Sequence, residues 1–271
     1  MSRLPPAAAA AQLSWLGSQG VSLARVALSA VHGTGLTTST AANAGDVLLS
    51  IPAPVWQPFS AATARQRVPA AVVGRVEERS TALGAGSSFC DAALLAYHLA
   101  EPSQRAHSPY LSGLPPSDVP LLWPAPLRGA LLGGTSAAPA AASQVALSDD
   151  ILAVLDGQGS SSGDRARAAS DERRAGFRWA QSVVLSRAHS GEGKPLALVP
   201  GLDLLNHGGD AAGAAVRFDP SAAAFELVAT RAHAPGEHLL IDYGTRASHR
   251  LLRLYGFVPS EGDAAAAAAA A

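Results

Sequence analysis

Gly201-Leu202-Asp203-Leu204-Leu205-Asn206-His207 is the most informative segment of this sequence. It is an apolar, strand-like run that ends on two polar side chains, Asn206 and His207. A buried polar atom needs a hydrogen-bond partner, so burying Asn206 and His207 in a purely structural core would cost free energy. A bound ligand is the usual reason for that cost. The residues alone leave a second interpretation open, in which Asn206 caps its own backbone and His207 packs in the core.

A second motif, Ile241-Asp242-Tyr243-Gly244-Thr245-Arg246, follows the first, and Leu254-Tyr255-Gly256-Phe257-Val258 comes after it. A tyrosine before glycine at the end of a strand is often a half-buried core residue whose hydroxyl reaches water. The motifs therefore make Tyr243 a candidate functional residue, but the residues alone do not assign it a role.

Metal chemistry is disfavoured by the pattern of possible ligands. Asp203, Asn206 and His207 fall within five residues on an irregular loop, which is poor geometry for zinc. The single cysteine, Cys90, excludes a disulfide framework and a thiolate zinc cluster. We expect no metal site.

Composition excludes several classes of protein. The chain has 271 residues, a net charge of −1 and no basic block, so it lacks the electrostatic footprint of a nucleic-acid or anionic-membrane binder. It has no strongly apolar run long enough to predict a membrane-spanning helix. Residues 2–12 are too short and too poor in arginine for a transit peptide, so the sequence does not specify the compartment.

The order of periodic patterns predicts an α+β fold. Helical spacing dominates from about residue 60 to 190, between segments that read as short strands. Asp219-Pro220-Ser221 is a good hairpin turn. A β core split by a helical insertion suits this order better than a doubly wound sheet. The predicted elements outside the insertion are a helix at 13–20, strands at 21–28, 46–51, 214–218, 225–229 and 238–243, and a helical turn at 247–254.

The combined motifs resemble SET-domain protein methyltransferases, in the class of Rubisco large-subunit lysine methyltransferase and actin-histidine methyltransferase. Besides the two motifs above, the resemblance rests on Leu13-Ser14-Trp15-Leu16, Gly33-Thr34-Gly35-Leu36, residues 46–52, Ser108-Pro109-Tyr110-Leu111, Phe177-Arg178-Trp179-Ala180 and Ser186-Arg187-Ala188. It implies a SET-type β core at 13–58 and 190–260 and a helical insertion at 59–189. It also implies a threaded C-terminal segment, with low-complexity tails at 1–12 and 261–271. The helical substrate-binding domain that usually follows in this class is not in the sequence.

The resemblance further implies S-adenosylmethionine as cofactor. Its expected binding residues are Gly33, Thr34 and Gly35 of the first glycine loop, Arg187 as a fork for the methionine carboxylate, Asn206 and His207, with Asp203 orienting their loop. His32 stands where the class usually has an acidic residue, so the carboxylate usually found at this position is missing here.

The resemblance makes Tyr243 the catalytic tyrosine and Tyr255 a wall of the lysine channel. Tyr255 and Ala188 favour lysine as acceptor, whereas the segment Tyr243–Arg246 is closer to the histidine-directed version. We therefore expect a protein-lysine N-methyltransferase, with protein-histidine methylation or a degenerate binding module as alternatives. The substrate is expected to be a lysine-bearing protein, with non-histone substrates favoured because the cysteine-rich zinc modules of many histone-directed enzymes are missing.

Overall fold

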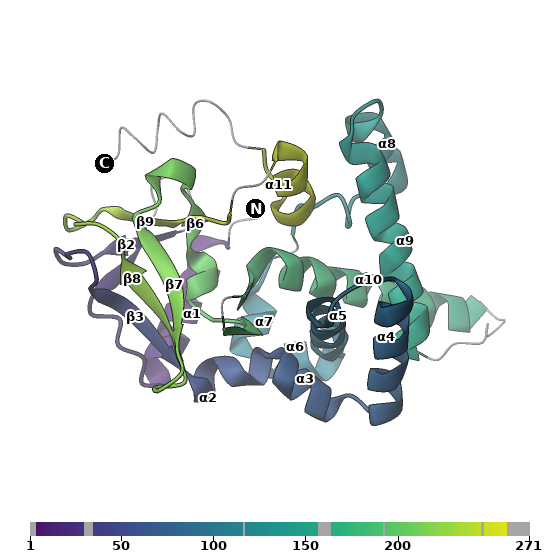
Figure 1. Ribbon diagram of the computed structural model, residues 1–271, viewed down its shortest axis with the longest axis horizontal. Helices are drawn as coiled ribbons and strands as arrows, with labels where there is room; N and C mark the ends of the chain where they lie inside the picture. Colours follow the sequence, from purple (N-terminus) through teal and green to yellow (C-terminus); the bar gives the residue numbers. More distant parts are fainter. Residues whose placement is uncertain are drawn as a thin grey trace.

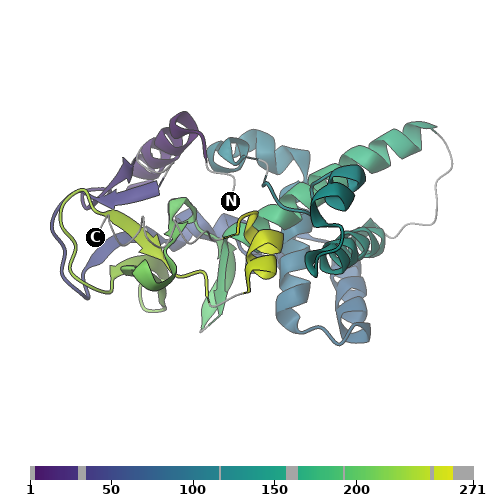
Figure 2. The same cartoon turned by 90° about the horizontal axis from the view of Figure 1, so that it is seen from above.

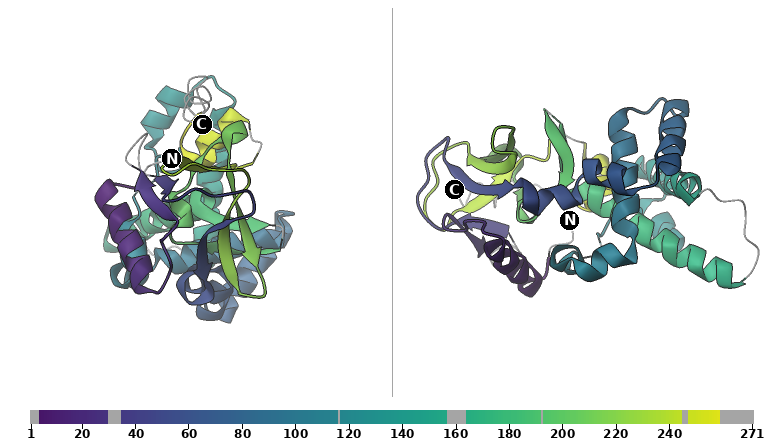
Figure 3. Two further views of the ribbon diagram at one scale, coloured as in Figure 1. Left: turned by 90° about the vertical axis from the view of Figure 1, so that its left-hand side faces the viewer. Right: turned by 90° about the horizontal axis from the view of Figure 1, so that it is seen from below.

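The computed structural model describes residues 4–29, 35–115, 117–156, 164–191, 193–244 and 247–258. Strands gather at one end of an elongated molecule and helices at the other (Figure 1). The chain runs through short strands, then helices, then strands again, which confirms the predicted α+β class. The view from below in Figure 3 shows the same division.

The strands form three small sheets. The first has the order β1-β2-β9-β6, the second β3-β8-β7, and the third is the hairpin β4-β5. All neighbours are antiparallel except β6 and β9, which are parallel. The strands are β1 (Val26–Ser29), β2 (Gly35–Thr38), β3 (Val47–Pro52), β4 (Ala188–Gly191), β5 (Lys194–Leu198), β6 (Asn206–His207), β7 (Ala214–Asp219), β8 (Ala224–Ala229) and β9 (His238–Ile241).

Helices occupy most of the chain between β3 and β4. They are α2 (Ala53–Trp56), η1 (Gln57–Phe59), α3 (Ala61–Arg67), α4 (Ala70–Ala82), α5 (Ser87–Ala100), α6 (Pro102–His107), α7 (Pro109–Gly113), α8 (Ala125–Leu132), α9 (Ala137–Asp156) and α10 (Asp164–Arg187). The remaining helical segments are α1 (Pro6–Ser18), η2 (Leu202–Leu204), η3 (Gly209–Ala211) and α11 (Ser248–Tyr255).

One large hydrophobic core runs through both ends of the molecule. Leu16 of α1, Leu49 of β3, Phe177 of α10 and Phe225 of β8 are fully buried in it. A second, smaller cluster of Leu132, Ala137 and Ala141 packs with Trp123 and Leu252 where α8, α9 and α11 meet. From above, α11 lies between the strands and this pair of helices (Figure 2).

The first helix departs from the sequence prediction. It begins at Pro6 and ends at Ser18, so the predicted helix at 13–20 starts too late, and residues 6–12 of the low-complexity segment are helical as well. Proline is well suited to the first helical position, and alanine has the highest helix propensity. Ala9, Leu13 and Leu16 then form the buried face of this helix.

Two strands also differ from the prediction. β1 starts at Val26, so residues 21–25 of the predicted strand are not in a sheet. Strand β2 starts at Gly35, at the end of the predicted glycine loop, and pairs with both β1 and β9. The hairpin predicted around Asp219 is confirmed, with β7 and β8 paired from Ala214 to Ala229.

The threading of the last segment stays a prediction, as do the domain boundaries. Within the described ranges, no helix is long and apolar enough to cross a membrane.

Candidate functional site

A buried carboxylate fixes the loop before β6. Asp203 accepts hydrogen bonds from Gln12 Nε2 at 2.8 Å and from the Tyr110 hydroxyl at 3.0 Å. The backbone N–H of Gly201 donates to it at 3.1 Å. Burial raises the pKa of Asp203, while the Arg187 charge and these hydrogen bonds act in the opposite direction. Because its side chain is 0% exposed and has three protein donors, Asp203 holds the loop in place.

Arg187 closes the other side of this loop. It ends helix α10, its side chain is 3% exposed, and its Nη1 donates to the backbone carbonyl of Asp203 at 2.9 Å. The same nitrogen lies 3.8 Å from the Asp203 carboxylate. A buried guanidinium is tolerated only with such partners. The loop and the end of α10 are therefore locked together by charge as well as by packing.

Three strands bring Asn206 to the glycine loop. Strand β6 pairs with β9, with Asn206 opposite Leu240, and β9 in turn pairs with β2. A Cβ atom placed on Gly35 would lie 2.7 Å from Asn206 Nδ2 and 2.5 Å from His238 Nε2. The backbone of β2 thus approaches two polar side chains so closely that a larger residue does not fit without a shift.

Four aromatic rings surround the end of β6. Their centroids are 5.2 Å apart for His207 and Tyr243, 4.7 Å for Tyr243 and Tyr255, 6.3 Å for Tyr255 and Phe257, and 5.9 Å for Phe257 and His207. Each ring contacts two others, so the four form a closed set, here called the aromatic box. Ring faces of this kind attract organic cations.

The Tyr243 hydroxyl is held within the box. It donates to the Leu205 carbonyl at 2.6 Å, and burial is the main cause that raises its pKa, so the phenol stays neutral at ordinary pH. The backbone N–H of Tyr243 donates to His207 Nδ1 at 3.2 Å. A neutral His207 therefore carries its proton on Nε2.

The structure thus gathers Gly35, Asn206, His207, Tyr243 and Tyr255 in one region, with Asp203 and Arg187 behind it. Gly33 and Thr34, the other two predicted cofactor residues, lie outside the described residues. Within the described ranges, no group of three His, Cys, Asp or Glu side chains could hold a metal ion.

Four residues of the region were missed as site residues: Gln12, Tyr110, His238 and Phe257. The sequence carries a signal for two of them, because Tyr110 and Phe257 belong to motifs that already supported the resemblance. Gln12 and His238 show no such signal. Their importance depends on contacts between segments that are far apart in the chain.

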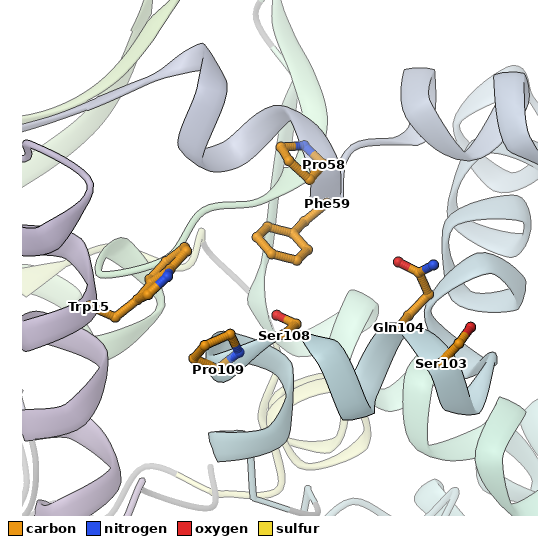
Figure 4. Close-up of a pocket in the computed structure, with 7 residues that line it drawn as sticks. All are labelled: Trp15, Pro58, Phe59, Ser103, Gln104, Ser108 and Pro109. Atoms are coloured by element: carbon orange, nitrogen blue, oxygen red, sulfur yellow. The ribbon is translucent and has the colours of Figure 1, made fainter.

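A separate pocket of about 460 Å³ opens between α1, η1, α6 and α7 (Figure 4). Tyr110 links its walls to Asp203, since its ring centroid lies 6.4 Å from that of Trp15 and 4.9 Å from that of Phe59. None of the described site residues lines this pocket. The lining residues are Trp15, Pro58, Phe59, Ser103, Gln104, Ser108 and Pro109.

Comparison with solved structures identifies the fold as that of a SET domain. The structure of the SET domain of LSMT bound to lysine and AdoHcy matches with a TM-score of 0.65 at 22% identity, over 95% of this chain and 58% of the other. Rubisco LSMT bound to sinefungin and monomethyllysine matches with a TM-score of 0.67 at 22% identity, over 95% and 57%. Rubisco LSMT bound to AdoMet matches with a TM-score of 0.65 at 20% identity, also over 95% and 57%.

The chain therefore spans less than three-fifths of the length of these structures. No protein-family model matches the sequence, and the search of the curated proteins finds no match either. The likeness is one of fold.

Proposed function

We propose that this chain is an S-adenosylmethionine-dependent protein-lysine N-methyltransferase. The observation that carries the proposal is the aromatic box, in which the Tyr243 ring packs against His207 and Tyr255 while its hydroxyl donates to the Leu205 carbonyl. It is supported by the likeness to SET-domain structures that hold AdoMet or AdoHcy, and lysine or methyllysine.

The residues around β6 fit such a cofactor. S-adenosylmethionine supplies a methyl group on a positively charged sulfur. We assign Gly33, Thr34 and Gly35 the close backbone approach, and Asn206 and His207 the polar contacts beside it. Arg187 would bind the methionine carboxylate of the cofactor with its planar guanidinium group, and Asp203 would orient the loop before β6. The fit rests on the bare backbone at Gly35, which faces Asn206 and His238.

Tyr243 and Tyr255 would orient the acceptor amine. Methyl transfer requires the nitrogen lone pair to be in line with the methyl group, and alignment alone contributes a large share of the rate. A dry, aromatic channel disfavours the charged form of a lysine, which must lose its proton to react. The neutral Tyr243 hydroxyl can hydrogen-bond that amine. Its ring, which packs on that of Tyr255, would form one side of the acceptor channel with it.

Lysine is the acceptor we favour over histidine. Tyr255, which marks the lysine-directed members in the resemblance, lies 4.7 Å from Tyr243 between ring centroids. Ala188 follows Arg187 where the histidine-directed relative has an asparagine that holds the target imidazole. The substrate would be a protein, with non-histone proteins favoured.

The test begins with calorimetric titration of S-adenosylmethionine into the wild type, Asn206→Ala and the exposed control Asn43→Ala. Wild type and control should bind, and Asn206→Ala should bind at least about tenfold more weakly, as expected for loss of a hydrogen bond to a charged ligand. Transfer of labelled methyl groups from the cofactor to protein extracts follows. Acid hydrolysis of the product then separates methyl-lysine from methyl-histidine. A folded wild type that does not bind the cofactor would exclude the enzyme and leave a degenerate SET fold.

A further inference from the structure

Helix α11 ends on a glycine that the structure uses as a contact point. Gly256 follows Tyr255 with φ +77°, in the left-handed region, and its N–H donates to the Leu252 carbonyl at 2.9 Å. A Cβ atom on Gly256 would lie 2.0 Å from the backbone carbonyl oxygen of Asp118. The end of α11 is therefore pressed directly onto the backbone of the 117–123 loop.

That loop is itself held in place. Val119 and Leu121 are each 1% exposed, and the Asp118 carboxylate accepts a hydrogen bond from Trp123 Nε1 at 2.7 Å. Trp123 and Leu252 of α11 both pack against the small cluster formed by α8 and α9. The loop thus meets the end of α11 at Asp118, and through Trp123 it packs on the same cluster as Leu252.

This contact lies directly beside Tyr255, which packs on Tyr243. Tyr255 directly precedes Gly256, and its ring packs on Tyr243 with centroids 4.7 Å apart. We propose that the 117–123 loop and Gly256 position Tyr255 against Tyr243, so that the helical part of the molecule sets the width of the acceptor channel. The inference deepens the proposed lysine methyltransferase activity and rests on it for its consequence, although the positioning itself can be measured without activity.

A spectroscopic test follows from the small number of tyrosines. The chain has four of them, Tyr97, Tyr110, Tyr243 and Tyr255, so 3-fluorotyrosine labelling gives four fluorine signals, each assignable by a Tyr→Phe variant. Gly256→Ala should shift the signals of Tyr255 and Tyr243 and leave that of Tyr110 in place.

Gly84→Ala is the matched control. Gly84 also follows a helix, also has a positive φ of +63°, and has no atom within 4 Å of a Cβ position. It therefore carries the same backbone strain without the contact, and should leave the Tyr243 and Tyr255 signals unchanged. If Gly256→Ala and Gly84→Ala give the same spectra for these two tyrosines, the proposal is wrong.

The second measurement is binding of monomethyllysine to protein saturated with AdoHcy. Gly256→Ala should weaken it by about 10–100-fold, since ångström-scale displacement of a positioning group has effects of that order. Trp123→Phe replaces the indole with a smaller phenyl ring and removes the bond to Asp118. It should shift the same two signals in the same direction by a smaller amount.

If Gly256→Ala does not fold, Trp123→Phe tests the positioning of Tyr255 in its place. An unchanged spectrum and unchanged lysine affinity in Trp123→Phe would then overturn the proposal. Wild-type protein that binds neither AdoHcy nor monomethyllysine would refute the proposed function instead. The fluorine spectra would still decide the positioning.

Discussion

Tyr243 is the residue on which the proposed chemistry depends most directly. Its hydroxyl donates to the Leu205 carbonyl at 2.6 Å, and its ring contacts Tyr255. Tyr243→Phe keeps the ring and removes the hydroxyl. We expect the turnover number to fall about 10²–10³-fold, as when a preorganised polar group is removed, with cofactor affinity within about twofold of wild type. Labelled methyl transfer and calorimetry measure the two effects, with Tyr97→Phe as control.

Normal turnover by Tyr243→Phe would remove this residue from the mechanism. Because the folded-state pKa of Tyr243 is raised above 10.0, its deprotonation should not reduce activity below that pH.

Tyr110 is a residue whose hydroxyl stabilises the fold through Asp203. Its side chain is buried, and its loss as Tyr110→Phe leaves one oxygen of a buried carboxylate with a missing donor. A buried group left unsatisfied costs about 1–3 kcal/mol of unfolding free energy. Urea denaturation should show that loss. Tyr97→Phe, at a partly exposed hydroxyl bonded to Arg173, should cost less because water can replace the bond. Equal losses in the two variants would contradict this account.

At the scale of elements, the close approach of β2 to β9 and β6 leads to a prediction for Gly35. In Gly35→Ala the new methyl group would meet His238 Nε2 and Asn206 Nδ2 at less than 3 Å, so both side chains must move. Cofactor affinity should drop about tenfold or more, by loss of at least one hydrogen bond to the ligand. Calorimetry measures it. Gly74→Ala, in helix α4 with open space around its Cβ position, should bind normally. Unchanged binding by Gly35→Ala would place the cofactor elsewhere.

The β4-β5 hairpin carries a pH-dependent contribution to stability. His189, opposite Ala197, packs 6.1 Å from Phe225 between ring centroids, and burial, with a smaller effect of Lys194, lowers its pKa to about 4. Between pH 6.5 and about 4, His189 therefore binds more protons in the unfolded chain than in the folded one. The contribution of His189 to the free energy of unfolding must then fall as the pH drops through this window.

We expect a loss of about 1–3 kcal/mol, allowing for the partial exposure of the ring. In urea titrations across this pH window, the unfolding free energy of His189→Gln should fall less than that of wild type, by that amount. The quantity to compare is the difference in unfolding free energy between wild type and His189→Gln at each pH. This difference isolates His189, because the pKa of buried His98 is also lowered and affects both proteins. Parallel pH profiles would contradict the prediction.

Local motifs predicted the elements well where the signal was local. The Asp219 turn and the helical segment before residue 190 each follow from neighbours in the sequence, whereas the strand predicted at 238–243 ends earlier, at Ile241. The pairing of β2 with β9 and the role of His238 could not be predicted in this way, because they join segments some 200 residues apart in the chain. Residues 6–12 were misread because an alanine-rich segment is ambiguous until its packing surface is known.

At the scale of the whole molecule, α1 connects the first residues of the chain to the site. Leu4 and Ala9 are buried, and Gln12 donates to Asp203. Deleting residues 1–12 should therefore lower the unfolding free energy by about 3 kcal/mol or more, from lost apolar burial and a lost donor to a buried carboxylate. Urea denaturation measures the loss. A truncated protein of wild-type stability would show that α1 contributes little.

The bond between Gln12 and Asp203 spans 191 positions of sequence. Translation at about 5–20 residues per second puts roughly 10–40 s between synthesis of the two partners. During that interval Gln12 lacks its acceptor, although Trp15 of α1 can already stack on Tyr110 of α7. The helices made in between can fold on local contacts. The bond that joins α1 to the loop before β6 can therefore form only after the helices between them have been made.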